Sequence, residues 1–233
     1  MSNTNISSSF LATIEIVTIQ MTYYGPIILL TVGIFGCLCN FLTFTSRQLR
    51  ENSCAFYFLC SAIFEFLSIT FGLSTRLAAD HFDYDLQNSN RIFCKFRAYY
   101  VSSIPLIATY FILLSAIDRY MSSSTDVYLR SFSKIKVAYR NMMLVQIGLS
   151  SILSLTRMIY YTYYIHGPLF TGDHKVIGSF LMSLTTLLYY TNYVKSFYIY
   201  TLTSQLFRSI FIQRIHSCIQ KRFESNTSII MIV

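Results

Sequence analysis

The sequence contains few charged residues for a chain of 233 residues. Only 12% are Asp, Glu, Lys or Arg, against roughly 25% in a typical soluble domain. A soluble globule of this size would need far more charge to cover its surface. Disorder is excluded as well, because disordered chains have low hydrophobicity and 54% of this chain is hydrophobic. The composition therefore predicts a protein with several membrane-spanning segments.

Signatures of common enzymes and metal sites are also absent. The chain has no HExxH motif, no paired CxxC, no glycine-rich phosphate loop and no GxSxG elbow. Residues 80–85 include three aspartates and a histidine, but we interpret this polar stretch as a solvated outer loop. We therefore predict that the protein is not an enzyme and that it needs no metal or cofactor.

Five apolar runs are long enough to cross a membrane. A spanning helix takes about 20 apolar residues, and the bilayer core favours helices because they satisfy their own backbone polar groups. We predict spans at residues 22–45, 52–75, 98–117, 141–165 and 176–206. The sequence thus predicts an all-α integral membrane protein with five transmembrane helices.

The positions of Lys and Arg predict the orientation of these spans. Both residues are enriched on the cytoplasmic side of membrane proteins. Neither occurs before Arg47, which follows the first span, and they cluster after the third and fifth spans. We therefore expect residues 1–21 to be extracellular, 22–206 to form the transmembrane domain and 207–233 to be cytoplasmic. Cytoplasmic loops explain the net charge of +8 without nucleic acid as a partner.

The cytoplasmic tail is predicted to form an amphipathic helix on the membrane surface. Its apolar residues recur every three to five positions, with basic residues between them: Phe207, Ile210, Phe211, Ile215, Cys218, Ile219 and Phe223. Acidic lipid attracts such a helix, although a soluble tail is the alternative. Cys218 is a candidate for palmitoylation. On the outer side, Asn5 heads a candidate N-glycosylation triplet that ends at Ser7.

Polar side chains inside the spans are candidates for function, because an ionisable residue at membrane depth is costly. Asn40 lies in the first span and Glu65 in the second. They could bind a cation or relay a rearrangement; alternatively, they only link two helices by hydrogen bonds. Lys195 in the fifth span could carry a Schiff base. We favour a lysine that faces a water-filled cavity or pairs with an acid such as Glu65.

Asp118, Arg119 and Tyr120 end the third span on its cytoplasmic side. The simplest interpretation is that these charges mark the end of a helix, with Arg favoured on the inner side. The functional alternative is an ion pair between Asp118 and Arg119 that breaks when the helices rearrange. Arg119 would then reach a cytoplasmic partner.

Six motifs, in this order, resemble those of rhodopsin-like (class A) G-protein-coupled receptors. They are Gly36-x-x-x-Asn40 for the first helix, Ser61 to Glu65 for the Leu-Ala-x-x-Asp of the second, Cys94 before the third, Asp118-Arg119-Tyr120 at its end, Ser196 to Tyr200 for Asn-Pro-x-x-Tyr, and Phe207-Arg208 for the start of helix eight. Glu replaces Asp at position 65, and only Tyr200 of the Asn-Pro-x-x-Tyr motif is kept.

The resemblance implies a multi-pass plasma-membrane receptor that signals from an extracellular peptide or small molecule to a heterotrimeric G protein. In this family the second-helix acid binds sodium and couples to activation, so it implies a polar cluster of Asn40, Glu65, Ser196 and Tyr200 with a sodium ion near Glu65. It assigns Asp118, Arg119 and Tyr120 as the switch whose arginine meets the G protein. In visual pigments of this family, the lysine that binds retinal occupies the position that matches Tyr190. Lys195 lies five residues later, so a photopigment is not expected.

The chain departs from the family by its number of spans. The five runs correspond to helices one, two, three, six and seven, so helices four and five are absent and the join falls near Arg140 and Asn141. The family's partner for Cys94 would lie in the absent loop, which implies that Cys94 is unpaired. Two other functions remain open: an interaction partner that forms hetero-oligomers with full-length receptors, and a small channel or transporter that uses Glu65 and Lys195.

Overall fold

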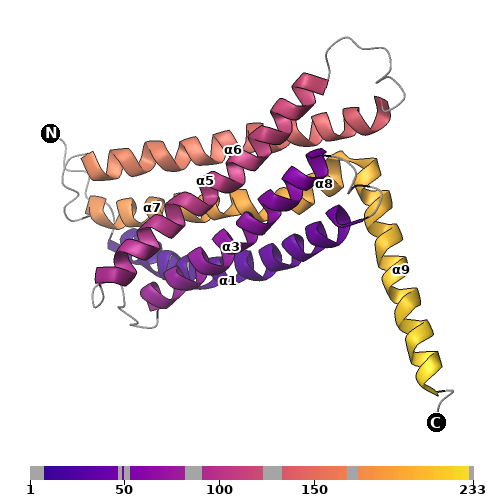
Figure 1. Ribbon diagram of the computed structural model, residues 1–233. Coiled ribbons are helices and arrows are strands. Elements are labelled where there is room, and N and C mark those ends of the chain that lie inside the picture. The colour runs from indigo at the N-terminus through magenta and orange to yellow at the C-terminus, as the bar shows by residue number, and fades with distance from the viewer. Residues whose placement is uncertain are drawn as a thin grey trace.

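The chain is described by a computed structural model that covers residues 8–46, 49, 53–81, 91–122, 133–166 and 173–230 (Figure 1). These residues form seven helices and no strand, which confirms the all-α prediction for the described part of the chain. The helices are α1 (Ser8–Phe44), α3 (Ser53–His81), α5 (Arg91–Ser122), α6 (Ser133–His166), α7 (Asp173–Val194), α8 (Ser196–Thr203) and α9 (Gln205–Ile230).

Four of these helices are long and apolar enough to cross a membrane. Their spanning segments are Ser9–Phe44, Cys54–His81, Arg91–Asp118 and Met143–Ile165. Each overlaps one of the first four predicted spans, so hydropathy located these helices. It did not locate their ends: α1 begins at Ser8 rather than at residue 22, since no proline or glycine precedes Gly25 to interrupt the helix.

The predicted fifth span is divided among α7, α8 and the first residues of α9. Within the described residues, α7 is not among the helices apolar enough to span. Several of its polar side chains are buried, including Thr185, Thr186 and Asn192, and they lower its hydropathy. The helix is interrupted at Lys195, and α8 ends before Ser204. Its packing therefore identifies α7 as part of the bundle, although its hydropathy does not identify it as a span.

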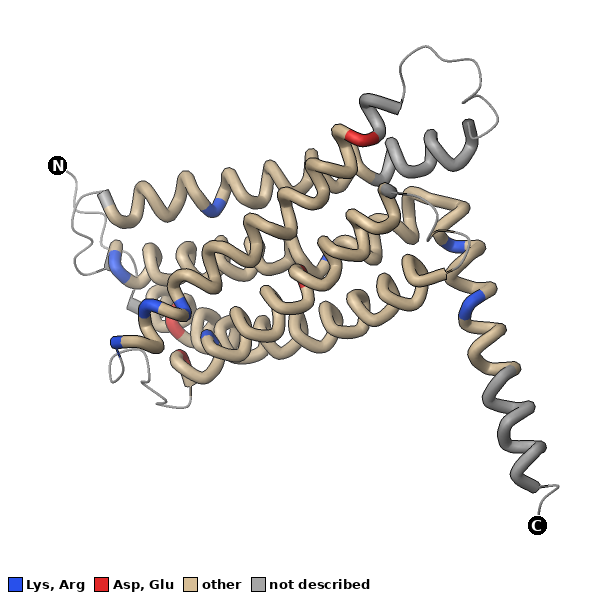
Figure 2. Tube along the Cα trace, viewed as in Figure 1, with Lys and Arg blue, Asp and Glu red and all other residues tan. Residues whose placement is uncertain are grey.

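Helices α1, α3, α5, α6 and α7 lie side by side and close into a ring (Figure 1). Helix α1 packs against α3 and α7, α3 against α5, α6 against α7, and α5 meets α6. Charged residues gather mainly towards the two ends of the bundle and leave most of its length uncharged (Figure 2). Helix α9 leaves one end at a steep angle (Figure 1), and Arg214 Nη2 donates a hydrogen bond of 2.8 Å to the carbonyl of Thr45, the residue that follows α1.

Several glycines, Gly72 and Gly36 among them, allow close approach of the helices. A Cβ atom at Gly72 of α3 would lie 2.7 Å from the Tyr190 hydroxyl oxygen of α7, and one at Gly36 would lie 3.3 Å from Phe197 Cβ of α8. Small residues at helix contacts let backbones approach in membrane bundles. Near the end from which α9 departs, the Tyr200 ring packs edge-on against neighbouring aromatic rings. These contacts fix α7 and α8 against α1 and α3.

Candidate functional site

The Glu65 carboxylate lies in the interior of the bundle and is 2% exposed. Ser196 of α8 donates a hydrogen bond of 2.8 Å to Glu65 Oε1, and the Ser61 hydroxyl lies 3.4 Å from the same oxygen. Ser61 also lies 3.2 Å from the Ala108 carbonyl of α5, so its single proton is shared between two acceptors. One buried acid thus connects α3, α5 and α8.

Gln146 of α6 extends this network to a fourth helix. Its Nε2 donates a hydrogen bond of 2.9 Å to Ser196 Oγ, and the side chain is buried. The result is a continuous chain of hydrogen bonds from the Ala108 carbonyl through Ser61, Glu65 and Ser196 to Gln146. Gln146 was not among the predicted site residues, although an amide within an apolar run is a signal of an interhelical hydrogen bond.

Lys195 lies at the joint between α7 and α8 and is only 8% exposed. Its ammonium donates hydrogen bonds of 2.8 Å to Ser150 Oγ and to the Asn192 carbonyl, and a third to Asn192 Oδ1. An ammonium has three protons, so this group is saturated. Lys195 therefore makes no direct ion pair with Glu65 among the described residues, although the two buried charges interact electrostatically.

Asn40 and Tyr200, the other members of the predicted polar cluster, are also buried. Within the described residues, Asn40 Oδ1 has no hydrogen-bond partner, and the same holds for Gln146 Oε1 and Ser115 Oγ. Tyr200 contributes its ring to the aromatic core. The structure therefore joins Glu65 to Ser196 by a direct hydrogen bond and leaves unused oxygens in the bundle interior.

At the opposite end of α5 from its first residue, Asp118 is held by α3. The Cys54 thiol lies 3.3 Å from Asp118 Oδ2 and 3.6 Å from the Ser115 carbonyl. The sequence alone did not predict this contact between α3 and α5. The side chains of Arg119 and Tyr120 lie outside the described part of the chain, so the predicted Asp118–Arg119 pair stays a prediction.

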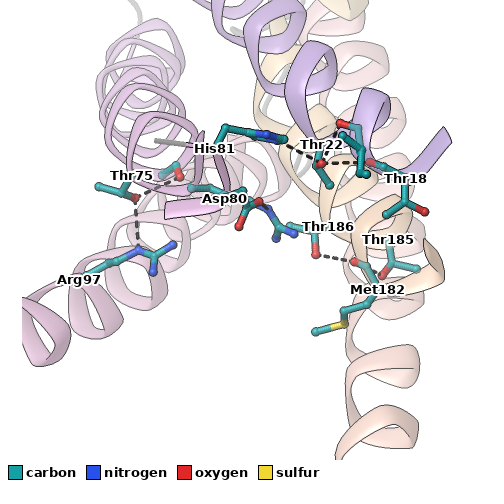
Figure 3. A network of polar contacts seen from close by, with 12 residues as sticks. Thr18, Thr22, Thr75, Asp80, His81, Arg97, Met182, Thr185 and Thr186 are labelled. Carbon is teal, nitrogen blue, oxygen red and sulfur yellow. Dashed lines mark hydrogen bonds and ion pairs between the residues drawn. The ribbon is translucent and has the colours of Figure 1, made fainter. Parts of the chain in front are cut away.

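The last turn of α3 corrects the loop prediction at residues 80 and 81, whereas residues 82–85 lie outside the described part of the chain. Asp80 and His81 belong to the helix. Asp80 Oδ2 pairs with Arg76 Nε at 3.2 Å, and His81 Nε2 lies 3.2 Å from Thr22 Oγ1 of α1 (Figure 3). These contacts stabilise the helix beyond its apolar run. Among the described residues, no group of three or more His, Cys, Asp or Glu side chains could hold a metal ion.

The remaining predicted sites are spread over the surface. Cys94 is half-buried in the first turn of α5, and Cys218 is exposed on α9. None of the six cysteines, all within the described part, forms a disulfide. Asn5 lies outside the described residues.

Arg157 of α6 is half-buried within a spanning segment. Its Nη1 lies 2.9 Å from the Met182 sulfur of α7, and its guanidinium carbon lies 5.1 Å from the centre of the Tyr161 ring. Nearby, the Tyr160 hydroxyl donates a hydrogen bond of 3.1 Å to the Gly178 carbonyl. No carboxylate pairs with Arg157 in the described part of the chain.

Comparisons of the chain with protein-family models, with curated proteins and with solved structures find no match.

Proposed function

We propose that the protein is a multi-pass plasma-membrane receptor that resembles rhodopsin-like G-protein-coupled receptors and signals to a heterotrimeric G protein. In this proposal α7 and α8 together form a fifth span, with the N-terminus outside and the C-terminus inside. The burial of polar side chains on α7 supports this, because inward-facing polar groups are compatible with a spanning helix in a bundle. Helix α9 then lies on the inner membrane surface.

The hydrogen-bonded chain around Glu65 is the observation that carries this proposal. It links α3, α5, α6 and α8 through one buried carboxylate. Any movement of α6 relative to α3 must break the Gln146–Ser196 bond or the Ser196–Glu65 bond. A ligand can favour the arrangement in which one of these bonds is broken only if it binds that arrangement more tightly than the intact one. A network with two such arrangements would act as the switch of a receptor.

A sodium ion near Glu65 belongs to the same proposal. Hard cations prefer oxygen ligands. The interior offers the Glu65 carboxylate together with the unused oxygens of Asn40 and Gln146. These residues fit a monovalent cation, and they would hold it by charge and by carbonyl-type oxygens. In this reading the cation stabilises the arrangement in which the carboxylate is buried.

The test is nucleotide exchange on a heterotrimeric G protein by the purified chain in lipid nanodiscs. We expect exchange above the G-protein background, and we expect Arg119→Ala to abolish it. Arg208→Ala is the matched control, because Arg208 is an exposed cation on α9 near the same end of the bundle. Equal exchange by the unmutated chain and Arg119→Ala, or no exchange by either, would refute signalling through this residue.

A second candidate function is supported by the outward faces of α5 and α6. Large apolar side chains are exposed there, such as Leu106 at 70% and Ile159 at 68%. Such faces suit lipid or another membrane helix, so the chain would associate with a full-length seven-helix receptor. The test is co-purification of tagged chain with a co-expressed seven-helix receptor in mild detergent. Failure to recover any such receptor removes this candidate.

A further inference from the structure

The backbone hydrogen bonds between α7 and α8 are interrupted around Lys195, which belongs to neither helix. The bonds of Lys195 itself are those of an α-helix. Its N–H donates to the Thr191 carbonyl at 3.1 Å, and its carbonyl accepts from Ile199 N–H at 2.9 Å. The next bond in a continuous helix would join Ser196 N–H to the Asn192 carbonyl. That bond is not formed, and α7 and α8 are therefore separate helices.

The side chain of Lys195 takes the place of the missing bond. Its Nζ donates a hydrogen bond of 2.8 Å to the Asn192 carbonyl, the acceptor that Ser196 N–H would use in a continuous helix. A second hydrogen bond from Nζ goes to Asn192 Oδ1. A cation is favourable at the C-terminal end of a helix, where carbonyl groups lack backbone donors. Lys195 therefore stabilises the interruption itself.

The interruption is also tied to α6. Lys195 Nζ donates a hydrogen bond of 2.8 Å to Ser150 Oγ. The next residue, Ser196, accepts one of 2.9 Å from Gln146 Nε2 and donates one of 2.8 Å to Glu65 Oε1. Gln146 and Ser150 are four positions apart, so they lie on one face of α6. The position of α8 after the interruption thus decides whether the Ser196 hydroxyl reaches Glu65.

We propose that Lys195 is a positioning residue that keeps α7 and α8 separate and thereby places the Ser196 hydroxyl on Glu65. In the second arrangement the ammonium keeps Ser150 and Asn192 Oδ1 but leaves the Asn192 carbonyl. Ser196 N–H then donates to that carbonyl, α7 continues into α8, and the Ser196 hydroxyl moves away from Glu65. The inference deepens the proposed function by naming the second arrangement of its switch, and it rests on that function only in treating the Glu65 network as a switch.

The test is amide hydrogen exchange of the full chain in lipid nanodiscs, measured by NMR. Carbon labels on Lys carbonyls and nitrogen labels on Ser isolate the Ser196 amide, because the sequence has only one Lys–Ser pair. The single Val–Lys pair isolates the Lys195 amide in the same way. We expect Ser196 N–H to exchange about fivefold faster or more, because only Lys195 N–H has its helical acceptor.

Lys195→Met should slow the exchange of Ser196 N–H by about fivefold or more, because the freed Asn192 carbonyl becomes its acceptor. In this variant the Ser196 amide is the Met–Ser signal that the unmutated chain lacks. A side chain that only stabilised the fold would behave in the opposite way, since its loss speeds exchange. Lys175→Met is the matched control, because it removes the same charge from an exposed position in the first turn of α7, and it should change the rate by less than about twofold.

Lys195→Leu is a second apolar variant with the same expected result, and circular dichroism verifies that each variant is folded. Exchange at Ser196 that is unchanged or faster in a folded Lys195 variant overturns the proposal. Equal exchange of the Ser196 and Lys195 amides in the unmutated chain overturns it as well, and this comparison decides if neither variant folds. None of these measurements involves a G protein, so they are independent of the Arg119 test of signalling.

Discussion

Replacing Ser196 by Ala tests the hydrogen-bonded chain directly, because one hydroxyl serves two partners. Ser196 Oγ donates to Glu65 Oε1 and accepts from Gln146 Nε2, and the side chain is 1% exposed. The substitution leaves the carboxylate with only the longer contact from Ser61 at 3.4 Å. It also leaves the Gln146 amide without its acceptor in a place that water does not reach.

Two ranges bound the cost of this change. A hydrogen bond to a charged group contributes about 1.5–3 kcal/mol in proteins, and a neutral one about 0.5–1.5 kcal/mol. Interhelical hydrogen bonds in membranes contribute less, about 0.6 kcal/mol on average, because the unfolded chain also finds partners. With two bonds lost and one of them charge-assisted, we expect the free energy of unfolding to fall by about 2 kcal/mol.

The assay is reversible unfolding of the chain in mixed lipid and detergent micelles, followed by circular dichroism. Ser68→Ala is the matched control, because Ser68 is 4% exposed but bonds only to the Phe64 carbonyl of its own helix. It should be close to neutral. In a Glu65→Gln background, the cost of Ser196→Ala should fall by roughly one third, because the bond to residue 65 weakens about twofold while the Gln146 bond is lost in both backgrounds. Equal costs for Ser196→Ala and Ser68→Ala would refute the reasoning.

Two further predictions concern packing and orientation. Gly72→Ala should lower the free energy of unfolding by about 1–3 kcal/mol, because its methyl group would lie 2.7 Å from the buried Tyr190 ring. Gly148→Ala is the control and should be neutral or stabilising, because nothing lies within 4 Å of that position. The same micelle assay compares the two variants, and equal effects would contradict the packing. A membrane-impermeant maleimide added to intact cells should label Cys94 but not Cys218. Both cysteines should react once the cells are permeabilised and hydroxylamine has removed any acyl group. Labelling of Cys218 alone on intact cells would reverse the proposed topology.

Hydropathy predicted the spanning helices but not their ends, for a physical reason. Apolar runs report on membrane depth, whereas a helix continues as long as its backbone hydrogen bonds and flanking contacts hold. The ion pair between Arg76 and Asp80 and the contact of His81 with Thr22 continue α3 into a polar segment. Conversely, the threonines and Asn192 of α7 lower its hydropathy, but these side chains are buried inside the bundle. A single sequence does not distinguish such a helix from one on a surface.

The candidate site was predictable only where a motif identified it. Glu65 and Ser196 are 131 positions apart, and resemblance rather than spacing paired them. Gln146 belongs to no motif, so its role emerged only from the packing of α6 against α8. Arg157 and Met182 are 25 positions apart and belong to different predicted spans, so their contact emerged only from the packing of α6 against α7.

Three helices of the bundle each carry a buried side-chain oxygen without a partner among the described residues: Asn40 Oδ1 on α1, Ser115 Oγ on α5 and Gln146 Oε1 on α6. An unsatisfied buried polar group costs about 1–3 kcal/mol. Of these three residues, Gln146 also belongs to the hydrogen-bonded chain, because its Nε2 donates to Ser196 Oγ. A movement of α6 that gave Gln146 Oε1 a partner would offset part of the free energy lost with the Gln146–Ser196 bond. A rearrangement of the bundle would therefore begin at Gln146.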